Sequence, residues 1–303
     1  MSDLAPHELR ILIAVDRERG FTAAAARLGM TQSAVSHAVR TCERKLGAVL
    51  FERGRHGARP TAAGERAVAY ARRIVRLMEA MGEEVRGGTR DATVTGPLRI
   101  AAFRSAAAHL LPAVLEKLTG RHPGLSPEVR IVREIGRGTA GEVADGRADL
   151  GIATLDAAGP PPGLTGARLF EEPYALAHPQ DRPHVDPRTL PLIDWDENCG
   201  SYTREWWAGQ DWIPSATVRA EDDTVVLSMI ARGMGMSIMP MLTLAGAPAG
   251  VAVTSLAPRP PRRSVGYVIA PESAESAAVR ALVRELRAAG APSTAASRRP
   301  RAE

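Results

Sequence analysis

Apolar side chains recur at helical spacing on both sides of a glycine near the start of the chain. Residues 23–28 carry small apolar side chains suited to one helix, and Thr22 is expected to be its N-cap. Gly29 follows and supplies the backbone freedom of a sharp turn, because glycine adopts a positive φ without strain. Apolar residues then return every three or four positions over residues 32–46, which predicts a second helix capped by Thr31. The pattern therefore predicts two helices joined by a tight turn.

The polar side of the second helix carries groups that can contact DNA. Amide, hydroxyl, imidazole and guanidinium groups of this size reach base edges and phosphates from a helix in the major groove. The residues expected to face outward are Gln32, Ser33, Ser36, His37 and Arg40. Two amphipathic helices joined at a glycine are also common in protein cores, so this pattern alone leaves a purely structural role open.

A basic segment interrupted by glycines follows at residues 51–60 and favours the DNA-binding interpretation. It predicts a short hairpin, or wing, whose Arg53 and Arg55 contact phosphates or an adjacent minor groove. The net charge of the chain is +5, and residues 1–90 contain 16 arginines and lysines against 10 acidic residues. The basic excess thus lies in the first third of the chain, as expected if only that part contacts phosphates.

The N-terminal motifs resemble those of a known family. They are Phe21-Thr22-x-Ala24-Ala25-x-x-Leu28, Gln32-Ser33-Ala34-Val35-Ser36, Leu46-Gly47-x-x-Leu50-Phe51-x-Arg53 and Thr61-x-x-Gly64. This series is similar to the DNA-binding domain of the LysR-type transcriptional regulators, without a gap over about sixty residues. Three positions depart from the family pattern: Gly20 and Cys42 replace a common Ser and Leu, and His37 stands where an arginine often meets DNA.

A long helix is predicted over the linker, residues 61–88, with Thr61 as its cap and Gly87-Gly88 at its end. Apolar residues along it alternate in spacings of four and three, which is typical of a coiled-coil seam. The seam residues are Ala67, Ala71, Ile74, Met78, Met81 and Val85. A helix packed on its own domain is the alternative. Pairing of two chains is favoured, and the family resemblance also implies a dimer or a dimer of dimers on a partly symmetric double-stranded DNA operator.

Short apolar runs alternate with helical segments beyond residue 97, which predicts an α/β fold with a parallel sheet. We expect a first lobe over residues 97–162 and 262–289, a crossover at residues 159–163, and a second lobe over residues 164–258. The DNA-binding domain would span residues 1–60, and residues 290–303 would be a disordered tail. The fold class is thus multidomain: an all-α winged helix-turn-helix with a long linker helix, then a two-lobed α/β domain.

The C-terminal part resembles the same family through Gly146-Arg147-Ala148-Asp149-Leu150-Gly151-Ile152 and Gly233-Met234-Gly235-Met236-Ser237-Ile238-Met239-Pro240. The resemblance implies two lobes like those of periplasmic solute-binding proteins, with a small-molecule effector in the cleft between them. Polar groups at strand ends and helix starts are candidates for contacting it. They are Arg104, Ser105, Thr139, Ser201, Tyr202 and Thr203, with Tyr267 on the returning strand. For each hydroxyl, capping of a helix without a ligand is the alternative.

All four tryptophans lie close together in the sequence, although only 4% of the chain is aromatic. They are Trp195, Trp206, Trp207 and Trp212. The cluster is suited either to an aromatic wall beside the cleft or to filling the core of a thin second lobe, and the second interpretation is favoured. Cys199 stands beside it without a second cysteine nearby, which argues against a redox role.

Composition and motifs exclude several other classes of protein. The two cysteines are far apart, so neither a disulfide framework nor a zinc site is expected. No nucleophile elbow, phosphate loop, metal-ligand cluster, leader or membrane-spanning apolar run is found. We therefore expect a cytoplasmic regulator without a cofactor or enzymatic activity. A solute-binding protein of the transport type is the alternative, disfavoured by the basic N-terminal domain.

Overall fold

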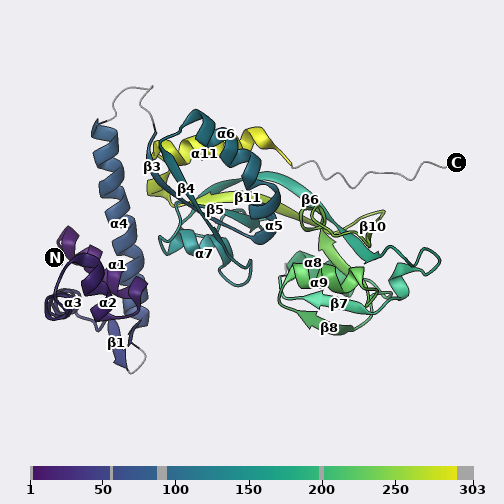
Figure 1. Ribbon diagram of the computed structural model, residues 1–303, viewed down its shortest axis with the longest axis horizontal. Helices are drawn as coiled ribbons and strands as arrows, with labels where there is room; N and C mark the ends of the chain where they lie inside the picture. Colours follow the sequence, from purple (N-terminus) through teal and green to yellow (C-terminus); the bar gives the residue numbers. More distant parts are fainter. Residues whose placement is uncertain (1–2, 55–56, 87–93, 198–200, 292–303) are drawn as a thin grey trace.

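The structure is a computed structural model, which describes residues 3–54, 57–86, 94–197 and 201–291. An N-terminal helical domain, a long helix and a two-lobed α/β domain follow one another along the chain (Figure 1). The N-terminal domain consists of α1 (Pro6–Glu18), α2 (Phe21–Leu28), α3 (Gln32–Leu46) and the hairpin strands β1 (Phe51–Gly54) and β2 (Gly57–Pro60).

The two helices and tight turn predicted from the sequence are present as α2 and α3. Gly29 ends α2 with a φ of 64°, and Thr31 caps α3 by accepting a hydrogen bond from the Ala34 amide at 3.2 Å. The prediction that Thr22 caps the first helix is wrong. Gly20 occupies the N-cap position, and the helix already includes Phe21, whose ring packs edge-on against Phe51 with centroids 6.4 Å apart.

The long helix α4 (Ala62–Arg86) is the predicted linker. Thr61 caps it by accepting a hydrogen bond from the Gly64 amide at 3.0 Å, as expected. The Gly87-Gly88 pair predicted to end it lies outside the described residues. The first half of α4 packs on α1, where Ala71 and Val75 are buried with Leu9.

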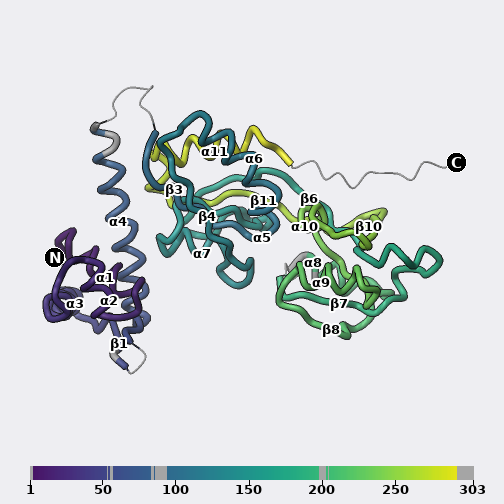
Figure 2. The backbone as a smooth tube through the Cα atoms, in the orientation of Figure 1, coloured from purple at the N-terminus to yellow at the C-terminus, as the bar shows by residue number. Residues whose placement is uncertain are grey.

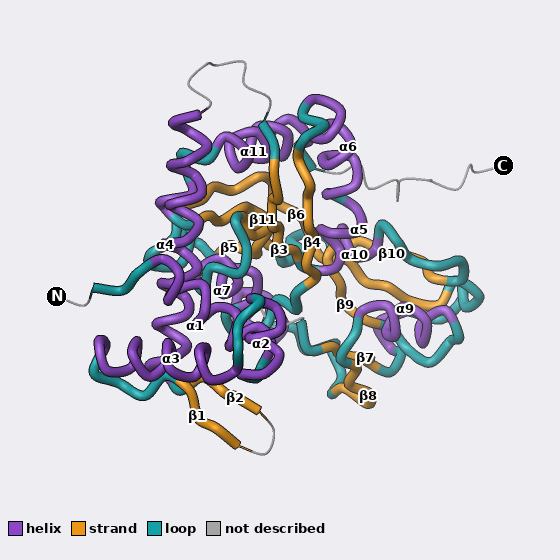
Figure 3. The backbone as a smooth tube through the Cα atoms, turned by 60° about the vertical axis from the view of Figure 1, so that its left-hand side comes forward, coloured by secondary structure: helices purple, strands orange, loops and turns teal. Residues whose placement is uncertain are grey.

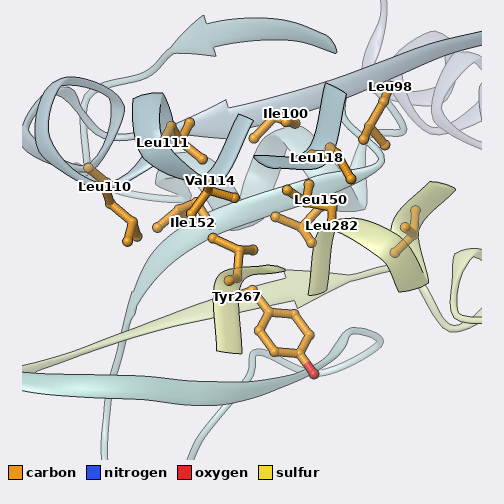
Figure 4. Close-up of a cluster of buried hydrophobic side chains, with 14 of the residues drawn as sticks. Leu98, Ile100, Leu110, Leu111, Val114, Leu118, Leu150, Ile152, Tyr267 and Leu282 are labelled. Atoms are coloured by element: carbon orange, nitrogen blue, oxygen red, sulfur yellow. The ribbon is translucent and has the colours of Figure 1, made fainter. Parts of the chain in front are cut away.

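The first lobe is a mixed sheet with helices on both faces. Its elements are β3 (Gly96–Ala102), α5 (Arg104–His109), α6 (Leu111–Arg121), β4 (Leu125–Ile131), α7 (Gly138–Ala144), β5 (Leu150–Leu155), β11 (Arg262–Ile269), the short turn η2 (Pro271–Ser273) and α11 (Ala277–Ala289). β4, β3 and β5 are parallel, as the sequence predicts, and β11 joins β5 antiparallel. α6 and α11 cover one face, and α7 lies on the other (Figure 1). Leu118, Ile152 and Leu282 are fully buried in the core beneath α6 and α11 (Figure 4).

A single long strand, β6 (Thr165–Pro179), belongs to both lobes (Figure 2). Its residues 165–173 pair with β11, and residues 174–179 pair with β9 (Ser237–Pro240) and β10 (Val251–Ser255). The chain therefore crosses between the lobes within β6, about ten residues later than the crossover expected at residues 159–163. An apolar strand pattern does not show where a strand changes its partners, so the sequence could not place this boundary.

The second lobe is built around the far half of β6. It also contains η1 (Pro187–Thr189), β7 (Leu192–Trp195), α8 (Ser201–Ala208), β8 (Ala216–Ala220), α9 (Asp223–Ala231) and α10 (Met241–Leu244). Trp195 is buried beside Ile193, while Trp206, Trp207 and Trp212 pack on the apolar cluster around Tyr174. This packing agrees with the interpretation that the tryptophans fill the second-lobe core.

Candidate DNA interface, linker helix and interlobe cleft

The predicted outward face of α3 is present with one exception. Gln32, Ser33, His37 and Arg40 are exposed, whereas Ser36 is only 4% exposed. The side-chain amide of Gln32 donates a hydrogen bond to the Ser36 hydroxyl at 2.9 Å, so Gln32 covers it from one turn away. The expectation that Ser36 faces outward is wrong for this reason.

The basic segment forms the predicted hairpin, with Phe51 opposite Pro60 and Gly54 opposite Gly57. It lies beside α3 at one end of the N-terminal domain (Figure 3). Arg53 is on β1, but its side chain and all of Arg55 lie outside the described residues. Arg59, which belongs to the same predicted basic segment but was not singled out as a contact, is exposed on β2.

Part of the seam predicted on α4 faces its own chain. Ala71 is fully buried against α1, and Ala67 packs on the core of the N-terminal domain. Ala71 is therefore not available to another chain in this arrangement, and Ala67 is only partly accessible. Of the other predicted residues, Met78 is half-buried and three are exposed. The exposed stripe on α4 consists of Tyr70, Ile74, Leu77, Met81 and Val85. The sequence prediction missed Tyr70 and Leu77. Together with Ile74 and Met81 they repeat at spacings of four and three residues, which is the same heptad pattern on a neighbouring face of the helix.

Three arginines of α4 hold the helix to the first lobe. Arg76 donates hydrogen bonds to the Asp149 carboxylate at 2.6 Å and to the Ala148 carbonyl at 2.9 Å. Arg73 pairs with Glu272, whose pKa it lowers. Arg72 pairs with Asp16 of α1 and donates to the Asp145 carbonyl at 3.3 Å. One guanidinium thus joins the N-terminal domain, the linker and the first lobe.

A cleft with a volume of about 640 Å³ lies between the lobes. Tyr174, at the crossing point, and Arg263, at the start of β11, line it together with Glu134 of the first lobe and Glu197 of the second. Its wall also includes Ile135, Gly136, Arg137, Gly138, Ala140, Gly141, Ala144, Thr154, Asp156, Pro161, Pro162 and Leu164. The cavity is large enough for a small polar molecule.

Ion pairs join the two lobes around this cleft, with the cations on the first lobe and the anions on the second. Arg104, an expected effector contact, pairs with Asp222 and lies 3.3 Å from Asp223. Burial raises the pKa of Asp222, but hydrogen bonds from Thr224 and Arg104 outweigh it and hold the pKa at about 2. The positive charge of Arg104 is therefore balanced by carboxylates of its own chain.

Arg133 forms the second interlobe contact. Its guanidinium lies 3.0 Å from Asp196 and 3.7 Å from Glu197. The backbone amide of Glu134 also donates to the Glu197 carboxylate at 3.4 Å. Burial raises the pKa of Glu197. Arg133 and Glu134 directly follow the second strand of the first lobe, but sequence reasoning did not identify them because a charged pair after a strand is common on protein surfaces.

The expected hydroxyl contacts differ in their surroundings. Ser105 is 5% exposed and accepts a hydrogen bond from Arg263 at 3.3 Å. Thr139 is fully buried, and both its amide and its hydroxyl donate to Glu134, which argues against Thr139 as an effector contact. Thr203 is fully buried, and its hydroxyl has no hydrogen-bond partner among the described residues. The side chains of Ser201 and Tyr202 lie outside the described residues, although both positions are on α8.

Tyr267 does not line the cleft. Its side chain is buried in the first-lobe core beside the other residues of Figure 4, and its hydroxyl accepts a hydrogen bond from Arg287 at 2.7 Å. Among the described residues, no group of three or more His, Cys, Asp or Glu side chains is placed to hold a metal ion. None of the described helices has the length and apolar character needed to cross a membrane.

Comparison with known proteins covers nearly the whole chain. Residues 6–65 match the bacterial regulatory helix-turn-helix protein family of the lysR type, and residues 91–291 match the LysR substrate binding domain. The probable HTH-type transcriptional regulator LrrA of Synechococcus elongatus is 33% identical over 289 residues, which are 92% of this chain and 95% of LrrA.

Two solved full-length regulators have a similar fold. An OxyR variant from Pseudomonas aeruginosa superposes with a TM-score of 0.74 at 22% identity, covering 96% of this chain and 97% of that one. CbnR complexed with its target DNA gives a TM-score of 0.63 at 20% identity, covering 95% and 100%. The helix-turn-helix with its hairpin, the linker helix and the two lobes thus occur in the same order in these proteins. On the two family matches and the likeness to LrrA, this chain is a member of the LysR family of bacterial transcriptional regulators.

Proposed function

We propose that the protein reads a specific DNA sequence through the exposed face of α3. Gln32, Ser33 and His37 would contact base edges in the major groove, with Ser36 reached only if Gln32 moves aside on binding. Arg40, Arg53 and Arg55 would contact phosphates or an adjacent minor groove. The observation that carries this proposal is the row of exposed polar side chains on α3 beside a basic hairpin.

The regulator acts as a dimer, or a dimer of dimers, held by the linker helices. Tyr70, Ile74, Leu77, Met81 and Val85 form an apolar stripe exposed on a 25-residue helix, and two such stripes can cover one another as in a coiled coil. A two-fold arrangement places two recognition helices about 34 Å apart, one turn of DNA, and requires a partly symmetric operator. CbnR, solved with its target DNA, has the same element order.

A small-molecule effector binds in the interlobe cleft and alters DNA binding. It does so only if its affinity differs between two arrangements of the lobes. The linker helix transmits the change, because it is attached to the first lobe through Arg73 and Arg76 and to the N-terminal domain through Arg72. We also infer that the protein acts in the cytoplasm, which its family and the proposed DNA partner support. The transport-type alternative accounts for the cleft but for neither α3 nor the linker.

Fluorescence-anisotropy titration against DNA from upstream of the protein's own gene tests this function. Wild type is compared with a Gln32→Ala/His37→Ala double variant at two salt concentrations, with scrambled DNA as competitor. Gln180→Ala, an exposed glutamine of the second lobe, is the matched control. Site-selective binding that only the double variant loses supports the proposal. Equal binding of the double variant and wild type to the upstream DNA contradicts the assignment of α3.

A further inference from the structure

One carboxylate at the wall of the cleft is bound by three donors of its own chain. Glu134 Oε2 accepts hydrogen bonds from the Thr139 amide and the Thr139 hydroxyl, both at 3.0 Å. Glu134 Oε1 accepts a hydrogen bond from the Thr154 amide of β5 at 2.8 Å. We call the place bounded by these three donors, the Thr139 amide, the Thr139 hydroxyl and the Thr154 amide, the carboxylate position. Hydrogen bonds to an ionised acceptor are among the stronger ones in proteins.

The backbone around this position is fitted to the Glu134 carboxylate. Gly138 has a φ of +45°, and a Cβ atom added there would lie 2.6 Å from Glu134 Oε2. A larger residue at 138 would therefore displace the carboxylate. Thr139 is fully buried, and both of its donors are hydrogen-bonded to Glu134.

The carboxylate position belongs to the effector cleft. Glu134, Gly138, Ala140 and Thr154 all line the cavity, and the Glu134 amide contacts Glu197 of the other lobe. Burial raises the pKa of Glu134 above its usual value, although the hydrogen bonds from Thr139 and Thr154 and the nearby Arg263 lower it in part.

We propose that Glu134 is a specificity-determining residue of the cleft: its carboxylate fills a binding position for a carboxylate in the wall of the first lobe, and thereby excludes effectors that would bind at this position through a carboxylate. The proposal rests on the proposed function, since it assigns selectivity to the effector cleft. A tethered group has a very high effective concentration at its own site, so a free carboxylate at millimolar concentration does not displace it.

Removing the side chain should convert this position into a receptor for small carboxylates. In Glu134→Ala the three donors lose their partner, and acetate is small enough to restore all three hydrogen bonds. Thermal unfolding of the full chain is measured in potassium acetate and in potassium chloride at equal concentration and pH. We expect acetate to raise the Tm of Glu134→Ala by about 2–4 °C over chloride, as for a ligand that binds only the folded state.

Two controls locate the effect. Glu128→Ala removes an exposed carboxylate of β4 and, like wild type, should show no difference between acetate and chloride. In a Glu134→Ala/Thr139→Val variant, which lacks one of the donors, the acetate shift should fall to half or less. An equal acetate shift in wild type, or no shift in a folded Glu134→Ala, would overturn the proposal.

A measurement on wild type keeps the proposal testable if Glu134→Ala does not fold. Hydrogen exchange of peptides containing the Thr139 and Thr154 amides should be slow at neutral pH and faster in Glu134→Gln, whose amide cannot accept from all three donors. Exchange of both amides in wild type at the rate of exposed amides contradicts the proposal. Neither experiment contains DNA, so a failure here is distinct from a failure of α3 to bind an operator.

Discussion

At the scale of single residues, the DNA-reading surface depends on how side chains of α3 satisfy one another in the absence of DNA. Gln32 donates to Ser36 and Thr31 lies 3.0 Å from Ser33, so two polar pairs already exist on the free protein. A base edge must replace the Gln32–Ser36 hydrogen bond for Gln32 to read it. The free energy by which Gln32 discriminates among bases is therefore the difference between its hydrogen bond to a base and its hydrogen bond to Ser36.

Substitution of Gln32 should reduce this discrimination. We expect Gln32→Ala to reduce the difference in binding free energy between operator and scrambled DNA by about 1–3 kcal/mol, the range for loss of a bidentate base contact. Competition titrations with single-base operator variants measure it. If the loss of binding free energy at every single-base variant is the same for Gln32→Ala as for wild type, Gln32 does not contact a base.

Arg53 should behave differently because phosphates carry no sequence information. We expect Arg53→Ala to weaken operator and scrambled DNA by the same factor, and to reduce the slope of log K against log salt by about 1. Anisotropy titrations over a series of salt concentrations measure both. A loss confined to the operator would instead make Arg53 a base-reading residue.

At the scale of elements, the linker helix shows why a repeat does not by itself identify an interface. The spacing of Ala67 and Ala71 predicts a seam, but both alanines are used by the N-terminal domain, and Ala71 is fully buried. Small residues allow α1 to approach α4 closely. The larger side chains on the neighbouring face, among them Tyr70 and Leu77, are left at the surface.

The exposed stripe yields a prediction about assembly. Leu77 is 52% exposed, so Leu77→Asp should leave the folded monomer intact while placing a charge in the paired seam. We expect sedimentation velocity to show dissociation at concentrations where wild type is dimeric, with an unchanged circular dichroism spectrum. Glu79→Ala, an exposed position between the seam residues, is the matched control. Wild-type assembly of the Leu77→Asp variant would show that the dimer forms elsewhere.

At the scale of the whole molecule, the sequence carries information about elements more than about the contacts between them. Helix caps such as Thr31 and Thr61 and the parallel strands of the first lobe follow from local patterns, and they are present. The chain leaves the first lobe within β6, and this depends on which strands pair with each half of β6. Arg133 pairs with Asp196, which is distant in sequence. Local patterns predict neither feature. Ser36 is not exposed and Thr139 does not line the cleft. Their hydroxyls are hydrogen-bonded to Gln32 and Glu134, four and five residues earlier, which the sequence pattern does not show.

The contact between Arg104 and Asp222 predicts a dependence of stability on pH. The folded-state pKa of Asp222 is about 2 against its ordinary value of 3.8, so its ionised form stabilises the fold above that value and the contribution is lost as the pH falls through about 2. We expect Asp222→Asn, which keeps the helix cap, to lower the free energy of unfolding by about 1–2 kcal/mol at neutral pH.

Urea denaturation at about pH 7 and about pH 3 measures this difference, which should shrink at the lower pH. Asp181→Asn, an exposed position of the second lobe, provides the comparison. If Asp222→Asn lowers the free energy of unfolding by the same amount at both pH values, the ion pair does not contribute to stability.

The attachment of the linker helix has a consequence for how such a protein can change over evolutionary time. Within the described residues, the ion pairs between α4 and the effector domain involve only the first lobe, through Asp149 and Glu272. The second lobe is joined to the rest through β6, β11 and the ion pairs across the cleft. Substitutions on the second-lobe side of the cleft can therefore change effector binding over evolutionary time without altering the contacts between the linker helix and the first lobe.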